Sequence, residues 1–278
     1  MPAANSITLR VITALVLAPL TVAAILGLPT PDFALVFALV VLLAAWEWTA
    51  LTGISSMPGR LAYIASTAVL LVLLWQIPLR DWSAYLLFLP GIWWLGIVVF
   101  LFRVRDVERS VSIDWMLIPA GFLVLLGPWV AMVRLHDVAD HGPVLVLFLM
   151  VLIWVADSAA FFVGRAWGRT KLAPRLSPGK TWAGVYGALA GAALCGVFLA
   201  WGLDSTGLSL LYTVLLCTVT ASISVVGDLY ESWLKRHRGI KDSGRLLPGH
   251  GGILDRIDSL TAAAPIFTLG ILWLEAGL

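Results

Sequence analysis

Residues 183–228 read AGVYGALAGAALCGVFLAWGLDSTGLSLLYTVLLCTVTASISVVGD. The stretch holds two apolar runs, 183–203 and 208–228, and each has about the 20 residues that a helix needs to cross a bilayer. The segment between them, Asp204–Gly207, is long enough only for a turn. We therefore expect two membrane-spanning helices that pack as a tight antiparallel pair.

The rest of the chain repeats this pattern of long apolar runs. Hydrophobic residues make up 60% of the 278 residues and charged residues 12%, whereas a soluble domain is about 45–50% apolar and about 25% charged. The sequence therefore predicts an all-α polytopic membrane protein with about nine transmembrane helices. The expected spans are 11–28, 33–51, 61–79, 84–102, 115–134, 143–163, 183–203, 208–228 and 259–277.

Positive charge gathers on one side of these spans. With the N-terminus in the cytoplasm, all 18 Lys and Arg residues except Arg80 and Arg134 fall in cytoplasmic segments or at their edges. Cytoplasmic loops of membrane proteins carry an excess of Lys and Arg. We therefore expect a cytoplasmic N-terminus.

The two longest cytoplasmic segments, 164–182 and 229–258, flank the helix pair. Long polar loops on a membrane scaffold are where function concentrates. We divide the chain into residues 1–142, with five spans, and residues 143–278, a catalytic region with four spans and both long loops. The active site is expected at the cytoplasmic helix ends.

Four carboxylates cluster in the second long segment. Asp255 and Asp258 are three residues apart where the last span begins, so they share a helix face, as do Asp228 and Glu231 at the end of the preceding span. Hard cations such as Mg²⁺ bind carboxylate oxygens and keep waters that phosphates can replace. These four residues are our candidate metal ligands. A solvated loop with incidental ion pairs would also explain them.

A glycine-rich turn and several cations surround these acids. Gly249, Gly251 and Gly252 allow the tight backbone that brings N–H groups close to an anion. Metal, Lys and Arg together suit a nucleoside triphosphate. His250 is open to three interpretations: a general base, a donor to phosphate, or a structural turn residue. The nearby basic residues are Lys235, Arg236, Lys241, Arg245 and Arg256.

Two further acids lie within predicted spans, where charge is costly and usually functional. Asp157 is near the inner end of the 143–163 span and could instead pair with Arg165. Glu47 lies between Trp46 and Trp48. We interpret Glu47 as a residue that reaches the membrane interface within an aromatic belt.

Three stretches of the second half resemble the phosphatidate cytidylyltransferase (CDP-diacylglycerol synthase) family. The longest stretch combines many fixed polar positions, so it is specific, whereas the first half matches only as a string of apolar spans. The stretches are DSAAFFVGR (157–165), SPGKTWAG (177–184) and SWLKRHRGIKDSGRLLPGHGGILDRID (232–258).

The resemblance implies transfer of a cytidylyl group from CTP to phosphatidate, giving CDP-diacylglycerol and pyrophosphate. It implies that Asp228, Asp255 and Asp258 hold Mg²⁺ with Glu231 beside them, and that Lys235 and Arg236 stabilise the transferring phosphates. The expected substrate-binding residues are Asp157, Arg165, Ser177, Lys180, Thr181, Lys241, Asp242, Gly249, His250, Gly251, Gly252 and Arg256.

The resemblance also implies a homodimer, K⁺ as a possible second ion, and a bacterial inner membrane with the site facing the cytoplasm. CTP, phosphatidate and membrane lipid are the expected partners, and nucleic acid is not. Two alternatives stay open. One is a CTP-dependent transferase for another phosphorylated or polyprenol lipid. The other is a cation transporter, although the acids gather at one face rather than along a path.

Overall fold

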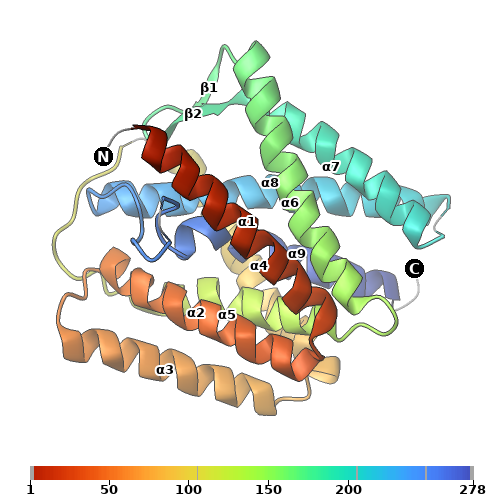
Figure 1. The fold of residues 1–278 in the computed structure, drawn as a ribbon, viewed down its shortest axis with the longest axis horizontal. Coiled ribbons are helices and arrows are strands. Elements are labelled where there is room, and N and C mark those ends of the chain that lie inside the picture. The colour runs from red at the N-terminus through yellow and green to blue at the C-terminus, as the bar shows by residue number, and fades with distance from the viewer. Residues whose placement is uncertain (1–2, 105, 205, 248, 276–278) are drawn as a thin grey trace.

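The chain folds into a bundle of long helices (Figure 1). The computed structural model describes residues 3–104, 106–204, 206–247 and 249–275, so Pro248 of the glycine-rich turn and residues 276–277 of the last predicted span lie outside the described residues. The helices in these ranges are α1 (Ala3–Gly27), α2 (Thr30–Thr52), α3 (Met57–Gln76), α4 (Leu79–Arg103), α5 (Leu117–His136), α6 (Gly142–Trp167), α7 (Trp182–Gly202), α8 (Leu208–His237) and α9 (Leu254–Glu275). The strands β1 (Lys171–Ala173) and β2 (Ser177–Thr181) pair antiparallel.

Each predicted apolar run falls mainly on one of these helices, although the 61–79 run passes the end of α3 at Gln76. Among the described residues, eight helices are long and apolar enough to cross a membrane, and α1 adds a shorter apolar part, Val11–Gly27. The predicted all-α polytopic membrane fold is therefore confirmed. The orientation of the termini across the membrane stays a prediction.

Two helix ends differ from the prediction in ways that matter for the site. α8 continues past residue 228 to His237, and α9 begins at Leu254 rather than at residue 259. The extension of α8 is amphipathic, because Leu229, Tyr230 and Leu234 are buried. The Tyr230 ring packs edge-on against Trp94 on α4, with centroids 5.8 Å apart. Tertiary packing thus stabilises α8 beyond residue 228, where the predicted apolar run ends.

Small residues let α7 approach α6 closely. A Cβ atom added at Gly187 would lie 2.6 Å from Cβ of Val163, and one added at Gly184 would lie 2.9 Å from the carbonyl oxygen of Ala160. Membrane helices that meet through small residues can bring their backbones together in this way. The contact fixes the two helices that flank the β1–β2 hairpin.

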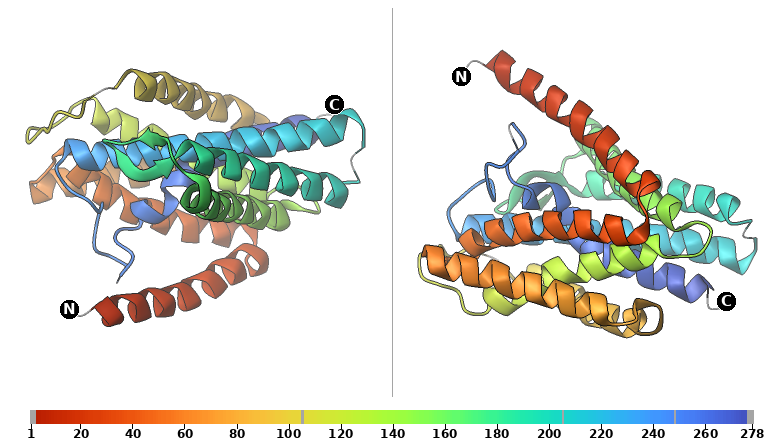
Figure 2. Two further views of the ribbon diagram at one scale, coloured as in Figure 1. Left: turned by 90° about the horizontal axis from the view of Figure 1, so that it is seen from above. Right: turned by 60° about the horizontal axis from the view of Figure 1, so that its bottom comes forward.

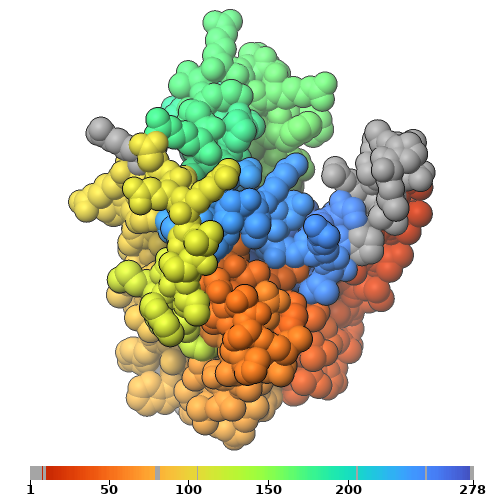
Figure 3. Space-filling model, turned by 90° about the vertical axis from the view of Figure 1, so that its left-hand side faces the viewer, coloured from red at the N-terminus to blue at the C-terminus, as the bar shows by residue number. Residues whose placement is uncertain are grey.

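The polar segments lie at one end of the bundle. Figure 1 shows the hairpin and the 238–253 loop at the same end, and Figure 3 views that end directly, with the hairpin in green, the loop in blue and segment 104–116 in yellow. α9 packs against α8 but also against α5, α4 and α2. The division into 1–142 and 143–278 stays a prediction, and helices from both parts meet at α9. Figure 2 shows α1 diverging from the other helices.

Candidate active site

Lys235 joins the carboxylates of α8 and α9. Its Nζ lies 3.0 Å from Oε1 of Glu231, one turn earlier on α8, and 2.7 Å from Oδ1 of Asp255 on α9. The Lys235 side chain is 13% exposed, and those of Glu231 and Asp255 are 5% and 6% exposed. The structure brings these three predicted site residues together, and the Lys235 ammonium group contacts both acids.

Asp255 is held on both of its oxygens. Oδ1 accepts the Lys235 bond, and Oδ2 accepts from the backbone N–H groups of Ser243 and Gly252 at 2.9 and 2.8 Å. The carboxylate therefore folds the 238–253 loop back onto the first turn of α9. Negative charge is also favoured there by the helix dipole.

Asp258 lies one turn further along α9, next to α8. Its Oδ1 accepts from the N–H of Ser259 at 2.7 Å, and its carbonyl oxygen faces Gly227 of α8, where an added Cβ would lie 2.6 Å away. Asp228, the next residue on α8, is therefore placed beside Asp258. The helix crossing at Gly227 brings the carboxylates of the two helices together.

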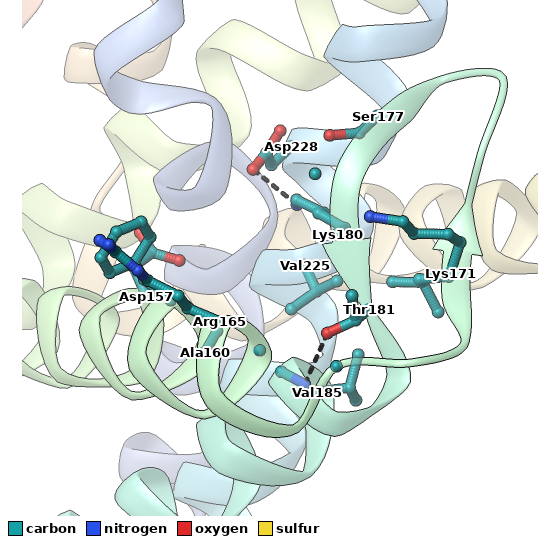
Figure 4. A pocket seen from close by; sticks show the side chains of 16 residues that line it. Asp157, Ala160, Arg165, Lys171, Ser177, Lys180, Thr181, Val185, Val225 and Asp228 are labelled. Carbon is teal, nitrogen blue, oxygen red and sulfur yellow. Dashed lines mark hydrogen bonds and ion pairs between the residues drawn. The ribbon is translucent and has the colours of Figure 1, made fainter.

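A cavity of about 670 Å³ lies next to these carboxylates, bordered by α6, α7, α8 and the hairpin. In Figure 4, Lys171 and Lys180 point from the hairpin toward this cavity, with Asp157 and Arg165 on α6 across from them. Within the described residues, Asp157 and Arg165 form no ion pair with each other. The cavity is lined by five of the sequence-predicted substrate residues and by one predicted catalytic acid: Asp157, Arg165, Ser177, Lys180, Thr181 and Asp228.

The hairpin places the ammonium group of Lys180 between this cavity and the carboxylate of Asp228. Nζ of Lys180 on β2 lies 2.6 Å from Oδ2 of Asp228 (Figure 4). Thr181 follows at the end of β2, and its Oγ1 accepts from the N–H of Gly184 at 3.1 Å, so it caps the N-terminus of α7. The hydroxyl of Thr181, a predicted substrate ligand, thus has a structural bond. The hairpin and Lys171 are the parts of this cavity that the sequence pattern did not indicate.

Two backbone hydrogen bonds within the glycine-rich turn hold it closed. The N–H of His250 donates to Leu247 O, and the N–H of Leu247 donates to Gly251 O, both at 2.9 Å. Gly249 and Gly251 have φ of 76° and 82°, which favours glycine. The buried Nδ1 of His250 has no hydrogen-bond partner within the described ranges.

The remaining predicted residues lie at the edge of the cluster. Lys241, Asp242 and Arg256 are exposed. Arg236 is partly buried and donates to Ile240 O at 3.4 Å, within the turn that ends α8. Their predicted roles toward substrate stay predictions.

The carboxylates match a hard cation in their chemistry. Glu231 is 4% exposed, and among the described residues its buried Oε2 has no hydrogen-bond partner. A buried carboxylate oxygen without a partner is costly, and a cation would satisfy it. In this arrangement no three His, Cys, Asp or Glu residues of the described ranges are grouped to hold one ion, and Lys235 contacts both Glu231 and Asp255. As hard carboxylate oxygens, the donors fit Mg²⁺ in their chemistry.

Glu47 is the residue whose place the sequence reasoning missed. It is 3% exposed rather than at the membrane interface, and it accepts hydrogen bonds from Ser243, Ile253 and Leu254. The interpretation of Glu47 as an interfacial residue is therefore wrong. In the sequence, Glu47 stood out only as an acidic residue within an apolar span. Such a residue indicates a function but does not show which residues it contacts.

Comparisons with known proteins find relatives that match most of this chain. Residues 8–273 match the cytidylyltransferase family. The chain is 44% identical over 265 residues to a phosphatidate cytidylyltransferase of Pseudomonas aeruginosa, covering 95% of this chain and 96% of the relative. It is 36% identical over 281 residues to one of Haemophilus influenzae, covering 93% and 96%, and 31% identical over 216 residues to one of Staphylococcus epidermidis, covering 77% and 79%.

Proposed function

The chain belongs to the cytidylyltransferase family, and from this premise we propose that it is a membrane enzyme that transfers a cytidylyl group from CTP to phosphatidate. The products are CDP-diacylglycerol and pyrophosphate. The observation that carries the proposal is the cluster of Lys180, Asp228, Glu231, Lys235 and Asp255 beside a cavity at the polar end of a membrane bundle.

The reaction is a displacement at phosphorus. An oxygen of the phosphatidate phosphate forms a bond to the α-phosphorus of CTP, and the bond from that phosphorus to the β-phosphate bridging oxygen breaks. A phosphomonoester has a second pKa of about 6, so the attacking oxygen is largely ionised near neutral pH. The protein therefore needs no strong general base, and catalysis depends on positioning and charge neutralisation.

The cations that line the cavity bind the phosphate groups. Arg165, Lys171 and Lys180 all border it, and Lys180 bridges from it to Asp228. On the adjoining helices, Phe161, Phe162 and Tyr186 are 58%, 68% and 64% exposed. Such side chains suit lipid tails, so the acyl chains stay in the bilayer while the headgroup enters the cavity.

Mg²⁺ is the cofactor that these carboxylates would hold. Asp228, Glu231, Asp255 and Asp258 are the residues that would ligate it, since their carboxylates lie on the facing turns of α8 and α9. When bound, Mg²⁺ would neutralise negative charge on the phosphate oxygens. Lys235, freed from Glu231, would then face the phosphates. A second ion such as K⁺ and a homodimer are proposed on the family resemblance alone.

The setting of the reaction is the inner membrane of a bacterium, with the site facing the cytoplasm. The relatives reported above are bacterial, and the apolar helices support an integral membrane protein. The excess of Lys and Arg at the polar end supports the cytoplasmic orientation.

The proposal is tested with purified protein in detergent, phosphatidate, and CTP labelled at either the α- or the γ-phosphate. We expect the α label in the lipid and the γ label in pyrophosphate, with Mg²⁺ required. Asp258→Ala should lower the rate at least roughly 100-fold, as removal of a charge-stabilising group does. Asp140→Asn, in the turn between α5 and α6, should match the wild type.

The same assay separates the alternatives. A γ label in the lipid would identify a CTP-dependent kinase instead. Activity on a polyprenol or another phosphorylated lipid, but not on phosphatidate, would change the acceptor. If folded wild-type protein makes no product from any of these lipids, cation uptake into proteoliposomes tests the transporter.

A further inference from the structure

Glu47 reaches across the bundle to the start of α9. It lies on α2, and its buried carboxylate accepts from Oγ of Ser243 at 3.1 Å, from the N–H of Ile253 at 3.0 Å and from the N–H of Leu254 at 2.8 Å. All three groups donate a hydrogen bond to the carboxylate. An ionised carboxylate can only accept hydrogen bonds, so the three contacts match that form. The bonds join residues about 200 positions apart in the chain.

The backbone around Glu47 is shaped to admit its carboxylate. A Cβ atom added at Gly244 would lie 2.2 Å from Oε1 of Glu47, and one added at Gly252 would lie 2.3 Å from Oε2. A side chain at either position would displace the Glu47 carboxylate from this place. Glycine at these two positions therefore allows the 238–253 loop to close directly over the acid.

Glu47 and Asp255 share the donors at this helix start. The N–H of Gly252 binds Asp255, and the next two N–H groups bind Glu47. Ser243 links both acids, because its N–H donates to Asp255 and its hydroxyl donates to Glu47. The first N–H groups of a helix have no partner within the helix, and here two of them are satisfied by a residue of another helix.

We propose that Glu47 is a positioning residue of the active site: it caps α9 from α2 and thereby holds Asp255 and Asp258 against Asp228 and Glu231. The inference rests on the proposed function and extends it to the N-terminal half of the chain. Residues that support metal ligands have effects of this kind, and their substitution costs about 10- to 100-fold in metal affinity or activity.

The central test compares Glu47→Gln with the wild type. Gln keeps the shape of the side chain, but its NH₂ group would face a backbone N–H or the Ser243 hydroxyl in place of an accepting oxygen. Thr49→Val is the matched control. Thr49 is fully buried on the same helix, and among the described residues its hydroxyl bonds to Trp46 O of that helix alone.

Steady-state kinetics, Mn²⁺ binding and amide exchange together distinguish a positioning role of Glu47 from a general contribution to stability. We expect Glu47→Gln to lower kcat roughly 10- to 100-fold and to weaken Mn²⁺ binding, followed by electron paramagnetic resonance without substrate, by a similar factor. The KM for phosphatidate should change by less than about threefold, since the lipid cavity is untouched. Amide exchange of peptides that cover 252–254 should accelerate, and Thr49→Val should leave all three unchanged.

Ser243→Ala provides a second variant if Glu47→Gln yields little folded protein. It removes one of the three bonds to Glu47 and keeps the Ser243 N–H on Asp255, so kcat should fall by a smaller factor of about 3 to 10. Unchanged kcat, Mn²⁺ affinity and exchange in a folded Glu47→Gln protein would overturn the proposal. So would equal losses in Thr49→Val. If the wild type itself lacks activity, the proposed function fails, whereas the exchange and Mn²⁺ data still test the link.

Discussion

Gly227 lets α8 and α9 approach at the level of the carboxylates. An added Cβ would lie 2.6 Å from Asp258 O and 2.9 Å from Cβ of Ala262. The nearer contact is a backbone atom, so it can be relieved only by moving a helix. The glycine in Val226-Gly227-Asp228 is therefore as much a part of the site as the acid that follows it.

We expect Gly227→Ala to push α9 away from α8 and to lower activity at least about 10-fold, with a loss of stability of about 1–3 kcal/mol from overpacking. CDP-diacylglycerol formation and thermal unfolding in detergent measure the two effects. Gly96→Ala on α4 is the control, because nothing lies within 4 Å of its added Cβ. Alanine is the better helix former, so Gly96→Ala should be neutral or stabilising. A fully active Gly227→Ala protein would show that the spacing of α8 and α9 does not matter.

At the scale of whole elements, the end of α8 is fastened to the N-terminal half. Arg238 follows α8, and its Nε donates to Leu51 O at 2.6 Å while its Nη1 donates to Ser110 O at 3.0 Å and Ser112 O at 2.6 Å. Burial lowers the pKa of Arg238, and the nearby carboxylate of Asp114 opposes this shift. The guanidinium thus ties α8, α2 and segment 104–116 together, just before the 238–253 loop begins.

Arg238→Ala should release segment 104–116, because its Ser110 and Ser112 carbonyl groups lose their donor and so does Leu51 O on α2. Trypsin cleavage in this segment, at Arg109, should accelerate about 10-fold or more, since hydrogen bonds to charged groups contribute about 1.5–3 kcal/mol each. Arg238→Lys should restore little, because an ammonium cannot reproduce the planar fork of guanidinium donors. Arg245→Ala, at an exposed position of the loop, should cleave like the wild type. Wild-type protection in Arg238→Lys would mean that charge alone holds the segment.

For the whole molecule, the distribution of Lys and Arg predicts which end of the bundle faces the cytoplasm. Both native cysteines, Cys195 and Cys217, are buried. Labelling by a thiol reagent therefore reports on an introduced, exposed cysteine. In a bacterial host, Ala139→Cys, in the exposed α5–α6 turn, should react with a membrane-impermeant maleimide in intact cells. Ser112→Cys, exposed on segment 104–116, should react only after the cells are permeabilised. The reverse pattern would invert the proposed topology.

The sequence alone predicted the parts of the fold that depend on local composition. An apolar run of about 20 residues is a property of its own residues, and the described part of each of the nine runs falls mainly on one helix. The motif residues at 228–258 also predicted a carboxylate and cation cluster, because Asp228 and Glu231, like Asp255 and Asp258, share a face by helical spacing alone. The ends of α8 and α9 were less predictable, because packing of Tyr230 on Trp94 extends the helix.

Only the tertiary structure decided which distant groups meet. The hairpin that carries Lys180 to Asp228 and the bonds from Glu47 to the start of α9 join segments whose own sequences name no partner. The glycine-rich turn was expected to offer N–H groups to an anion; in the structure the N–H of Gly252 binds Asp255 and that of His250 binds Leu247 O. Buried donors and acceptors must be paired, and which residue pairs with which is fixed by the packing of helices far apart in the chain.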